Sequence, residues 1–524
     1  MNRLQLIPKS CPGIFIFIFS LLILPAQRAF SQEKQPTLHY SVSMPDPSNH
    51  SFHITLDCSG LPEQIINFKL PKWMPGYYQI MNYGDFIGEV SAKDKAGNEL
   101  VIKKTSGNSW QLRVAKNRAF TLTYDVKAEK RFVANSFLDS SHAYLVPAAT
   151  FFYIDGRLNS PVYVEVNPGP WKQIATGLEN VKGKPWNFFA ADVDILYDCP
   201  LLIGNLQQLP SFYVKGKEHR FIGYKMGLFD EQLLMNNLEK MVKAASNIFG
   251  DIPYKQYTFI GIGPGRGGIE HLNNTTVSFD GKALNSAAGM HTMMSFLAHE
   301  YFHHYNVKRV RPFELGPFDY QKENRTNSLW ISEGLSVYYE YIVLKRAGLI
   351  NEETLLQDME RNINALENNP GRFHQSLVQA SYDTWSDGPF GKQGADSNRS
   401  ISYYEKGPIV GMFLDFAIRN ATQNRRSLDD VFTFLYLEYY KKQHRGFTEA
   451  EFQQVCESVS GMSMASFFEY IYTTQELDYH NYLEYAGLSI SETTTAKGKK
   501  QFTIKRKANI SPAQSALLEG WLGN

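Results

Sequence analysis

Two patterns of hydrophobic and polar positions divide this chain. Between about residues 37 and 213, short segments alternate apolar and polar residues, for example 39–43 and 120–126, and Gly, Pro and Asn separate them. Alternation with a period of two is typical of strands that bury one face. The pattern predicts a substantial, mostly antiparallel N-terminal β domain.

After about Lys217 the apolar residues recur at the spacing of a helix. This spacing predicts helices over residues 230–249, 287–307, 328–347, 352–367, 404–419, 428–441 and 449–455. Residues 309–327, rich in Pro, Gly and charge, predict an ordered connection between two of these helices. Beyond about residue 482 the strand pattern returns.

These patterns together predict a multidomain α+β protein. We expect an N-terminal β domain over residues 32–213, a mostly helical domain over 214–481 and a short C-terminal β segment over 482–524. Residues 1–31 resemble a secretory signal peptide, because basic Arg3 and Lys9 precede an apolar run over 13–24. That run is shorter than the roughly 20 residues that span a bilayer. We expect an exported protein, periplasmic or secreted, with an uncleaved signal anchor as the alternative.

Composition narrows the classes of partner. Lys and Arg number 53 against 52 Asp and Glu, so no global charge excess indicates binding to nucleic acid or to an anionic membrane. Outside the predicted signal peptide the cysteines are Cys58, Cys199 and Cys456. Three widely spaced cysteines do not make a disulfide framework. The nature of the partner therefore has to come from the chemistry of a site.

The strongest chemical signal is the sequence H-E-Y-F-H at residues 299–303. On a helix, at about 100° per residue, His299 and His303 project from one face and Glu300 lies beside them. Two imidazoles and one carboxylate at this spacing can supply two ligands and the general base of a catalytic zinc site. The motif predicts a metallopeptidase.

A catalytic zinc ion usually takes three protein ligands. Two carboxylates downstream of His303 compete for the third position, namely Glu323 and Glu333. Glu333 lies in a strongly helical run that can pack against the first helix, which favours it. Spacing alone leaves both open.

Several segments together resemble the glycyl aminopeptidase family of gluzincin metallopeptidases. The resemblance rests on residues 299–303, on N-V-K-R-V-R-P at 306–312, on P-F-D-Y at 317–320 and on W-I-S-E-G at 330–334. L-P-K-W-M-P-G-Y-Y at 70–78 is similar to an element of the family's β domain, with Tyr77 in place of the usual serine. The resemblance covers roughly residues 37–485.

The resemblance implies a thermolysin-like fold for the helical domain and roles for three further residues. Glu333 is then the third zinc ligand. Glu270, in G-G-I-E-H at 267–271, is similar to the glutamate that binds the free α-amino group of the substrate. Tyr404, in Y-E-K-G at 404–407, is similar to the tyrosine that faces the zinc and stabilises the oxyanion. Residues 510–523 look like the start of a PDZ-like domain too short to be complete, whereas Tyr403 and His304 are expected only to pack or to face solvent.

The expected function is that of a zinc aminopeptidase. The resemblance implies one zinc ion per chain and peptide substrates with a free N-terminus. It also implies release of a small N-terminal residue, glycine or alanine. Two alternatives use the same residues differently: an endopeptidase with the same metal site, and an inert peptide-binding protein. The sequence predicts no oligomeric state.

Overall fold

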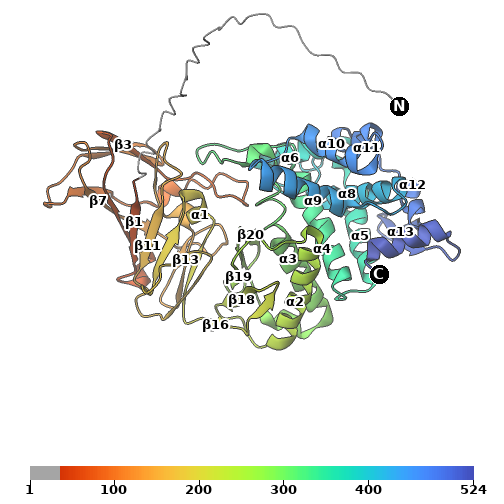
Figure 1. Ribbon diagram of the computed structural model, residues 1–524, viewed down its shortest axis with the longest axis horizontal. Helices are drawn as coiled ribbons and strands as arrows, with labels where there is room; N and C mark the ends of the chain where they lie inside the picture. The colour runs from red at the N-terminus through yellow and green to blue at the C-terminus, as the bar shows by residue number, and fades with distance from the viewer. Residues whose placement is uncertain (1–35) are drawn as a thin grey trace, which may run out of the picture. The chain divides into compact units, whose positions relative to one another are not determined.

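The computed structural model describes residues 36–524, which form one unit. The predicted signal peptide, residues 1–31, lies outside the described residues. Figure 1 shows a strand-rich first part, coloured red to yellow, and a helix-rich remainder, coloured green to blue. Within residues 36–524, no helix is both long enough and apolar enough to cross a lipid bilayer.

The first part of the chain folds into three sheets, as the alternating pattern predicts. Its elements are β1 (Leu38–Ser43), β2 (Ser51–Cys58), β3 (Ile65–Lys69), β4 (Ser91–Asp94), β5 (Ile102–Ser106), β6 (Ser109–Arg113), β7 (Phe120–Lys127), β8 (Phe137–Leu138), β9 (His142–Leu145), β10 (Tyr153–Ile154), β11 (Val162–Val166), β12 (Gln173–Thr176), β13 (Glu179–Asn180), β14 (Asn187–Ala190), α1 (Val193–Tyr197) and β15 (Leu201–Gly204). A seven-stranded sheet has the order β13-β14-β11-β1-β2-β7-β4 and is antiparallel except between β1 and β11. Two four-stranded sheets, β10-β3-β6-β5 and β12-β15-β9-β8, are antiparallel throughout.

The register between β2 and β7 shows why the alternation matters. Phe52 pairs with Val126 and Ile54 with Tyr124, and all four side chains are buried. The intervening positions of β2 are half-buried. Because side chains alternate between the faces of a strand, a slip by one residue would move the whole apolar set out of the core. The predicted β domain is confirmed.

The second part of the chain begins with a sheet of its own, which the helical pattern did not reveal. Its strands are β16 (Gln207–Gln208), β17 (Phe212–Val214), β18 (Lys217–Gly223), β19 (Gln256–Gly261), β20 (Gly268–Glu270) and β21 (Asn274–Val277). β18, β19 and β21 run parallel, and β20 pairs antiparallel with β21 at the edge. Figure 1 shows this sheet beside the green helices α2 and α3.

Each of the seven predicted helical segments contains a helix, and in the segment 287–307 the helix ends at Phe302. The helices of this part are α2 (Glu231–Phe249), α3 (Ala287–Phe302), α4 (Leu335–Arg346), α5 (Glu352–Glu367), α6 (Leu377–Tyr382), α7 (Thr384–Asp387), α8 (Tyr403–Ala421), α9 (Leu428–Leu435), α10 (Glu449–Ser460), α11 (Ala465–Tyr472) and α12 (Tyr479–Tyr485). Two of the segments include a π-helical turn: Trp330–Gly334 leads into α4, and Tyr436–Lys442 continues α9. One large apolar core joins this sheet and these helices.

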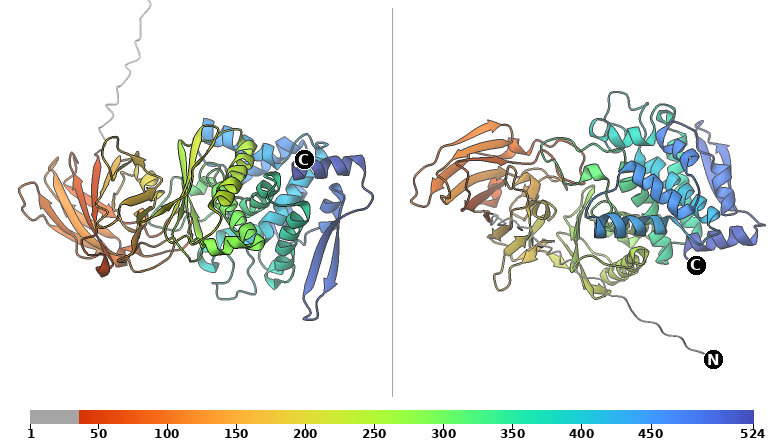
Figure 2. Two further views of the ribbon diagram at one scale, coloured as in Figure 1. Left: turned by 90° about the horizontal axis from the view of Figure 1, so that it is seen from below. Right: turned by 45° about the horizontal axis from the view of Figure 1, so that its top comes forward.

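The C-terminal segment forms a hairpin, β22 (Leu488–Thr494) and β23 (Lys500–Arg506), followed by helix α13 (Pro512–Leu522). The hairpin confirms the predicted C-terminal β segment. The helix was not predicted, because residues 510–523 had been interpreted as the start of a PDZ-like domain. In the left view of Figure 2 the hairpin, in dark blue, lies at the edge of the helical part.

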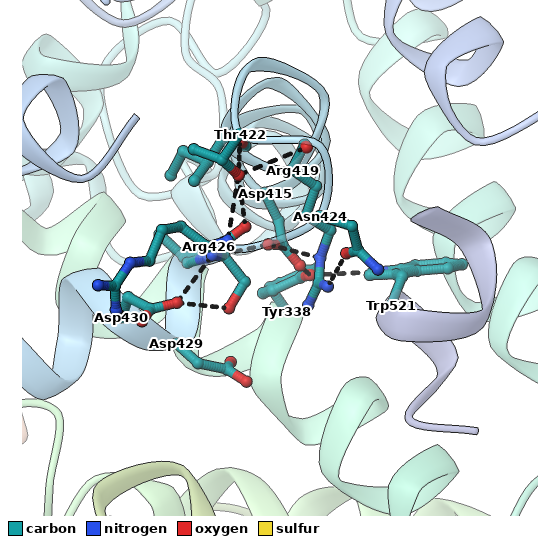
Figure 3. A network of polar contacts seen from close by, with 12 residues as sticks. Tyr338, Asp415, Arg419, Thr422, Asn424, Arg426, Asp429, Asp430 and Trp521 are labelled. Atoms are coloured by element: carbon teal, nitrogen blue, oxygen red, sulfur yellow. Dashed lines mark hydrogen bonds and ion pairs between the residues drawn. The ribbon is translucent and has the colours of Figure 1, made fainter. Parts of the chain in front are cut away.

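A buried polar network attaches α13 to the helices beneath it (Figure 3). The indole of Trp521 donates to the hydroxyl of Tyr338 (3.0 Å), which donates to the carboxylate of Asp415 (2.6 Å). Asp415 also accepts from the Arg419 guanidinium (3.0 Å) and from the backbone N–H of Leu428 (2.9 Å). The carboxylate of Asp415 thus holds together α4, α8, α9 and α13.

We predict that Asp415→Ala lowers the free energy of unfolding by about 3–5 kcal/mol, because it leaves the buried Arg419 without its counter-charge. The measurement is guanidinium unfolding followed by circular dichroism. The matched control is Glu239→Ala, which removes an exposed ion pair with Lys243 on α2 and is expected to change stability by less than about 0.5 kcal/mol. Equal effects of the two variants would contradict the role given to Asp415.

Candidate metal centre

Helix α3 places two imidazoles one turn apart in the interior. Its N-cap is Ser286, whose hydroxyl accepts from the backbone N–H of Gly289 (3.1 Å). At the other end of the helix, His299 and His303 are 8% and 1% exposed. Their Nε2 atoms lie 2.9 Å apart. The predicted pair therefore converges on one point.

The third group at this point is Glu333, in the π-helical turn Trp330–Gly334. Its Oε2 lies 3.6 Å from Nε2 of His299 and 3.3 Å from Nε2 of His303, and the residue is 2% exposed. The competing carboxylate, Glu323, instead pairs with the guanidinium of Arg325 (2.7 Å). The structure brings Glu333, and not Glu323, to the two imidazoles.

The spacing of these three groups fits a metal ion. Ligand atoms at about 2.0–2.1 Å from a tetrahedral zinc ion lie roughly 3.3 Å from one another, close to the separations found here. His299, His303 and Glu333 also form the one group of three potential ligand residues found among residues 36–524. Two imidazole nitrogens and a carboxylate oxygen are typical ligands of a catalytic zinc ion.

Burial and charge act in opposite directions on the ionisation of Glu333. Burial by itself raises the pKa of the carboxyl, but the charge of His303 and the hydrogen bonds of both imidazoles outweigh it and lower the pKa. Glu333 is therefore a carboxylate, as a metal ligand must be.

Asn306, just after α3, connects His303 to the turn that carries Glu333. Its backbone carbonyl oxygen lies 2.8 Å from Nδ1 of His303. Its side-chain amide donates to the carbonyl oxygens of Ile331 (2.8 Å) and Ser332 (3.2 Å). A hydrogen on Nδ1 of His303 leaves the lone pair of Nε2 free for a metal. One buried residue thus orients one ligand and positions the segment of another.

Glu340, on α4, lies behind His299, in a contact that has the distance of an ion pair but not the geometry of a hydrogen bond. Its carboxylate lies 3.1 Å from Nδ1 of His299 and accepts from the hydroxyl of Ser295 (2.8 Å). A carboxylate behind a ligand histidine fixes the ring and strengthens it as a ligand. The sequence reasoning missed Glu340, although it follows Glu333 by seven residues, about two turns, and so projects from the same face.

Two glycines bring Tyr404 to the metal cluster. A Cβ atom on Gly334 would lie 2.8 Å from the Cα of Gly407, so the turn before α4 and helix α8 touch backbone to backbone. This close approach places the hydroxyl of Tyr404 2.9 Å from Oε2 of Glu333. A second hydroxyl, that of Tyr78, lies 3.4 Å from Oε1 of Glu333 and was not predicted.

Glu300 lies next to the ligands with its carboxylate against the edge strand β20. A Cβ atom on Gly268 would lie 2.5 Å from Oε1 of Glu300, so only glycine leaves room for the carboxylate there. Oε2 is buried and has no hydrogen-bond partner in the described part of the chain. Burial raises the pKa of Glu300 to about 7, against the opposing charges of His299 and His303. A carboxyl with this pKa can both accept and release a proton near neutral pH.

Glu270, at the end of β20, is 4% exposed. A Cβ atom on Gly76 would lie 2.7 Å from its Oε2, and Gly76 has φ of +91°, which other residues rarely adopt. The ammonium of Lys308 lies 3.9 Å from Oε1 of Glu270 and 2.9 Å from the carboxylate of Asp198. Glu270 is thus held between the β domain and the helix–sheet part.

A cavity of about 710 Å³ gives access to the site. His299, Glu300, Tyr404 and Glu340 line it, together with Gly76 and Gly268, the two glycines that contact Glu270 and Glu300. Further lining residues are Tyr77, Tyr78, Phe296, Val337, Tyr341, Arg361 and Phe390. The cavity has mainly aromatic and apolar walls and a few convergent charges, as substrate sites commonly do.

Tyr403 and His304 pack in the interior, as expected. The hydroxyl of Tyr403 lies 2.9 Å from that of Thr384, and the residue is 1% exposed. The ring of His304 lies 3.7 Å from that of Tyr305.

Comparison with known proteins agrees with this geometry. A sequence model of the Peptidase M61 N-terminal domain matches residues 39–205, and a model of the M61 glycyl aminopeptidase matches residues 292–410. Together the two ranges span more than half of the chain. Among curated proteins, none matches the sequence.

Solved structures share the fold. An aminopeptidase N family protein from Idiomarina loihiensis is 26% identical, with a TM-score of 0.81 over 87% of this chain and 79% of that one. An M1 zinc metallopeptidase from Deinococcus radiodurans is 13% identical, with a TM-score of 0.51 over 85% of this chain and 95% of that one. Yeast LTA4 hydrolase, solved with bestatin, is 14% identical, with a TM-score of 0.52 over 87% and 71%.

The two family matches cover both the β domain and the segment that carries the metal cluster. Neither extends over residues 482–524, so the PDZ-like character of that segment stays a prediction. The chain belongs to the M61 glycyl aminopeptidase family and is a peptidase.

Proposed function

We propose that this protein is a zinc aminopeptidase that releases glycine or alanine from the N-terminus of peptides. The observation that carries the proposal is the buried cluster of His299, His303 and Glu333 beside the carboxylate of Glu300 in a substrate-sized cavity. The preference for glycine or alanine is supported by the family's description as glycyl aminopeptidase.

The three clustered residues hold one zinc ion in this proposal. Bound there, zinc supplies a Lewis acid for the substrate carbonyl and lowers the pKa of a water molecule. Glu340 and the backbone of Asn306 keep the two imidazoles in the orientation that presents Nε2 to the ion.

Glu300 transfers the proton of the reaction. It accepts a proton from the attacking water and then gives it to the nitrogen of the leaving peptide. Its position beside the cluster, with Oε2 free of any hydrogen bond within the described residues, suits both halves of this task. Tyr404, next to Glu333, donates a hydrogen bond to the carbonyl oxygen as negative charge develops there.

Glu270 binds the α-ammonium group of the substrate. Its Oε1 is buried and makes no hydrogen bond within the described residues, so it can accept one from an ammonium. The fixed separation of Glu270 from the metal cluster then places the first peptide bond at Glu300. An endopeptidase has no need of such an anchor.

We predict that Glu300→Gln lowers kcat for alanyl p-nitroanilide by roughly 10²–10⁴-fold, because it removes the proton acceptor. Zinc content, measured by mass spectrometry of the purified protein, is expected to stay near one per chain. Glu323→Gln, the same change at a half-buried carboxylate outside the cluster, serves as the control and should leave both quantities unchanged. A Glu300→Gln enzyme with the wild-type rate would refute the mechanism.

The amine anchor predicts a second result. Wild-type protein should cleave free alanyl and glycyl peptides and leave their N-acetylated forms intact, and Glu270→Ala should lower kcat/KM on the free peptides by roughly 10- to 100-fold, the worth of a hydrogen bond to a charged group. Product analysis by mass spectrometry gives both measurements. Equal cleavage of the acetylated forms would favour the endopeptidase alternative.

Glu340→Gln is expected to weaken zinc binding by about 10- to 100-fold, as loss of a carboxylate behind a ligand histidine does. Competition with a chromogenic chelator measures the affinity. Glu323→Gln should bind zinc as tightly as the wild type. If Glu340→Gln also does so, His299 is held by other contacts.

A further inference from the structure

A second, larger cavity adjoins the catalytic one. Its volume is about 1130 Å³, and Phe390 lines both cavities. The ring of Phe390 stacks on that of Tyr404, with centroids 5.4 Å apart, and is 57% exposed. Tyr404 contacts the metal cluster through Glu333. The two cavities therefore adjoin at Phe390.

The C-terminal hairpin forms one wall of the second cavity, and α5 holds that hairpin in place. The Asn364 amide exchanges two hydrogen bonds with the backbone of Phe502 (2.7 and 3.3 Å). The Asn368 amide does the same with Lys500 (3.0 and 2.8 Å). These bonds satisfy the free edge of β23, so the hairpin is a fixed wall rather than a loose tail.

The second cavity is lined by cations. Its lining includes Lys392, from the α7–α8 connection, and Lys497, Lys499 and Lys500, from the hairpin. The lining has one carboxylate, that of Glu405, which is half-buried. Lys500 pairs with Glu492 at 3.3 Å, whereas the other three lysines make no ion pair with a residue in the described part of the chain. The chain as a whole is close to neutral, so this concentration of charge is local.

We propose that the second cavity, a lysine-lined groove, binds the downstream part of the peptide substrate and favours acidic residues there. The inference rests on the proposed function, which places the substrate amine at Glu270 and its first peptide bond at Glu300. A peptide anchored there continues past Tyr404 and Phe390 into the groove. Three lysines without an ion pair among the described residues, with Lys500 beside them, outnumber Glu405 and attract aspartate and glutamate side chains and the terminal carboxylate.

Peptide binding tests the groove without relying on turnover. Two fluorescently labelled hexapeptides, both beginning Ala-Ala-Ala and ending in three aspartates or three glutamines, are titrated against zinc-loaded Glu300→Gln protein by fluorescence polarisation. We expect roughly 10-fold tighter binding of the acidic peptide at low salt. The two affinities should converge at about 1 M salt, where the Debye length falls to about 3 Å.

The triple variant Lys497→Gln, Lys499→Gln, Lys500→Gln is expected to lose most of the preference for the acidic peptide, and addition of Lys392→Gln to remove the rest. The control variant Lys116→Gln, Lys182→Gln, Lys184→Gln removes the same charge from the exposed surface of the β domain and should keep the preference. Equal binding of the two peptides by the unaltered groove overturns the proposal. So does a preference that survives the hairpin substitutions combined with Lys392→Gln, which would assign it to Arg361 in the catalytic cavity. Turnover of alanyl tripeptides by the wild type tests the proposed function separately.

Discussion

The hydrogen bonds of Asn306 are the interaction on which the rest of the site depends. Its backbone fixes the ring of His303, and its side chain holds the carbonyls of the π-helical turn that carries Glu333. Because Asn306 is fully buried, the turn has no water to bond instead. The three clustered side chains, from two separate helices, are thereby held in one fixed relation.

A second constraint is the contact between the carboxylate of Glu333 and the hydroxyl of Tyr404. Helices normally pack 8–10 Å apart, whereas here a Cβ atom on Gly334 would lie 2.8 Å from the Cα of Gly407. Gly334 and Gly407 remove both Cβ atoms at the crossing and let the backbones touch. The glycines that follow the functional residues in W-I-S-E-G and Y-E-K-G therefore allow the two backbones to approach closely, and are not there for flexibility. Alanine at either position would move Tyr404 away from the cluster.

Local patterns in the sequence predicted a large share of this structure, and the limits have a physical cause. Helical spacing and strand alternation depend on near neighbours, so the helices, the β domain and the proximity of His299 to His303 could be predicted. Contacts between distant segments carry no such signal. Tyr78 reaches Glu333 across 255 positions, and the resemblance to a family, not the spacing, selected Glu333 over Glu323. The strands of the second sheet lie among helices, and their short apolar runs do not distinguish strand from buried helix.

The C-terminal segment is fastened by contacts with distant parts of the chain, which its own sequence does not reveal. In the structure its edge is satisfied by the amides of Asn364 and Asn368, and its helix is fastened through Trp521 to the buried Asp415. Both attachments are to helices of the metal-binding part. Because the hairpin is joined to that part at two places, its lysines stay at a set distance from Phe390. A fixed distance lets the charge of the groove select among peptides by the position of their acidic residues, and not only attract them.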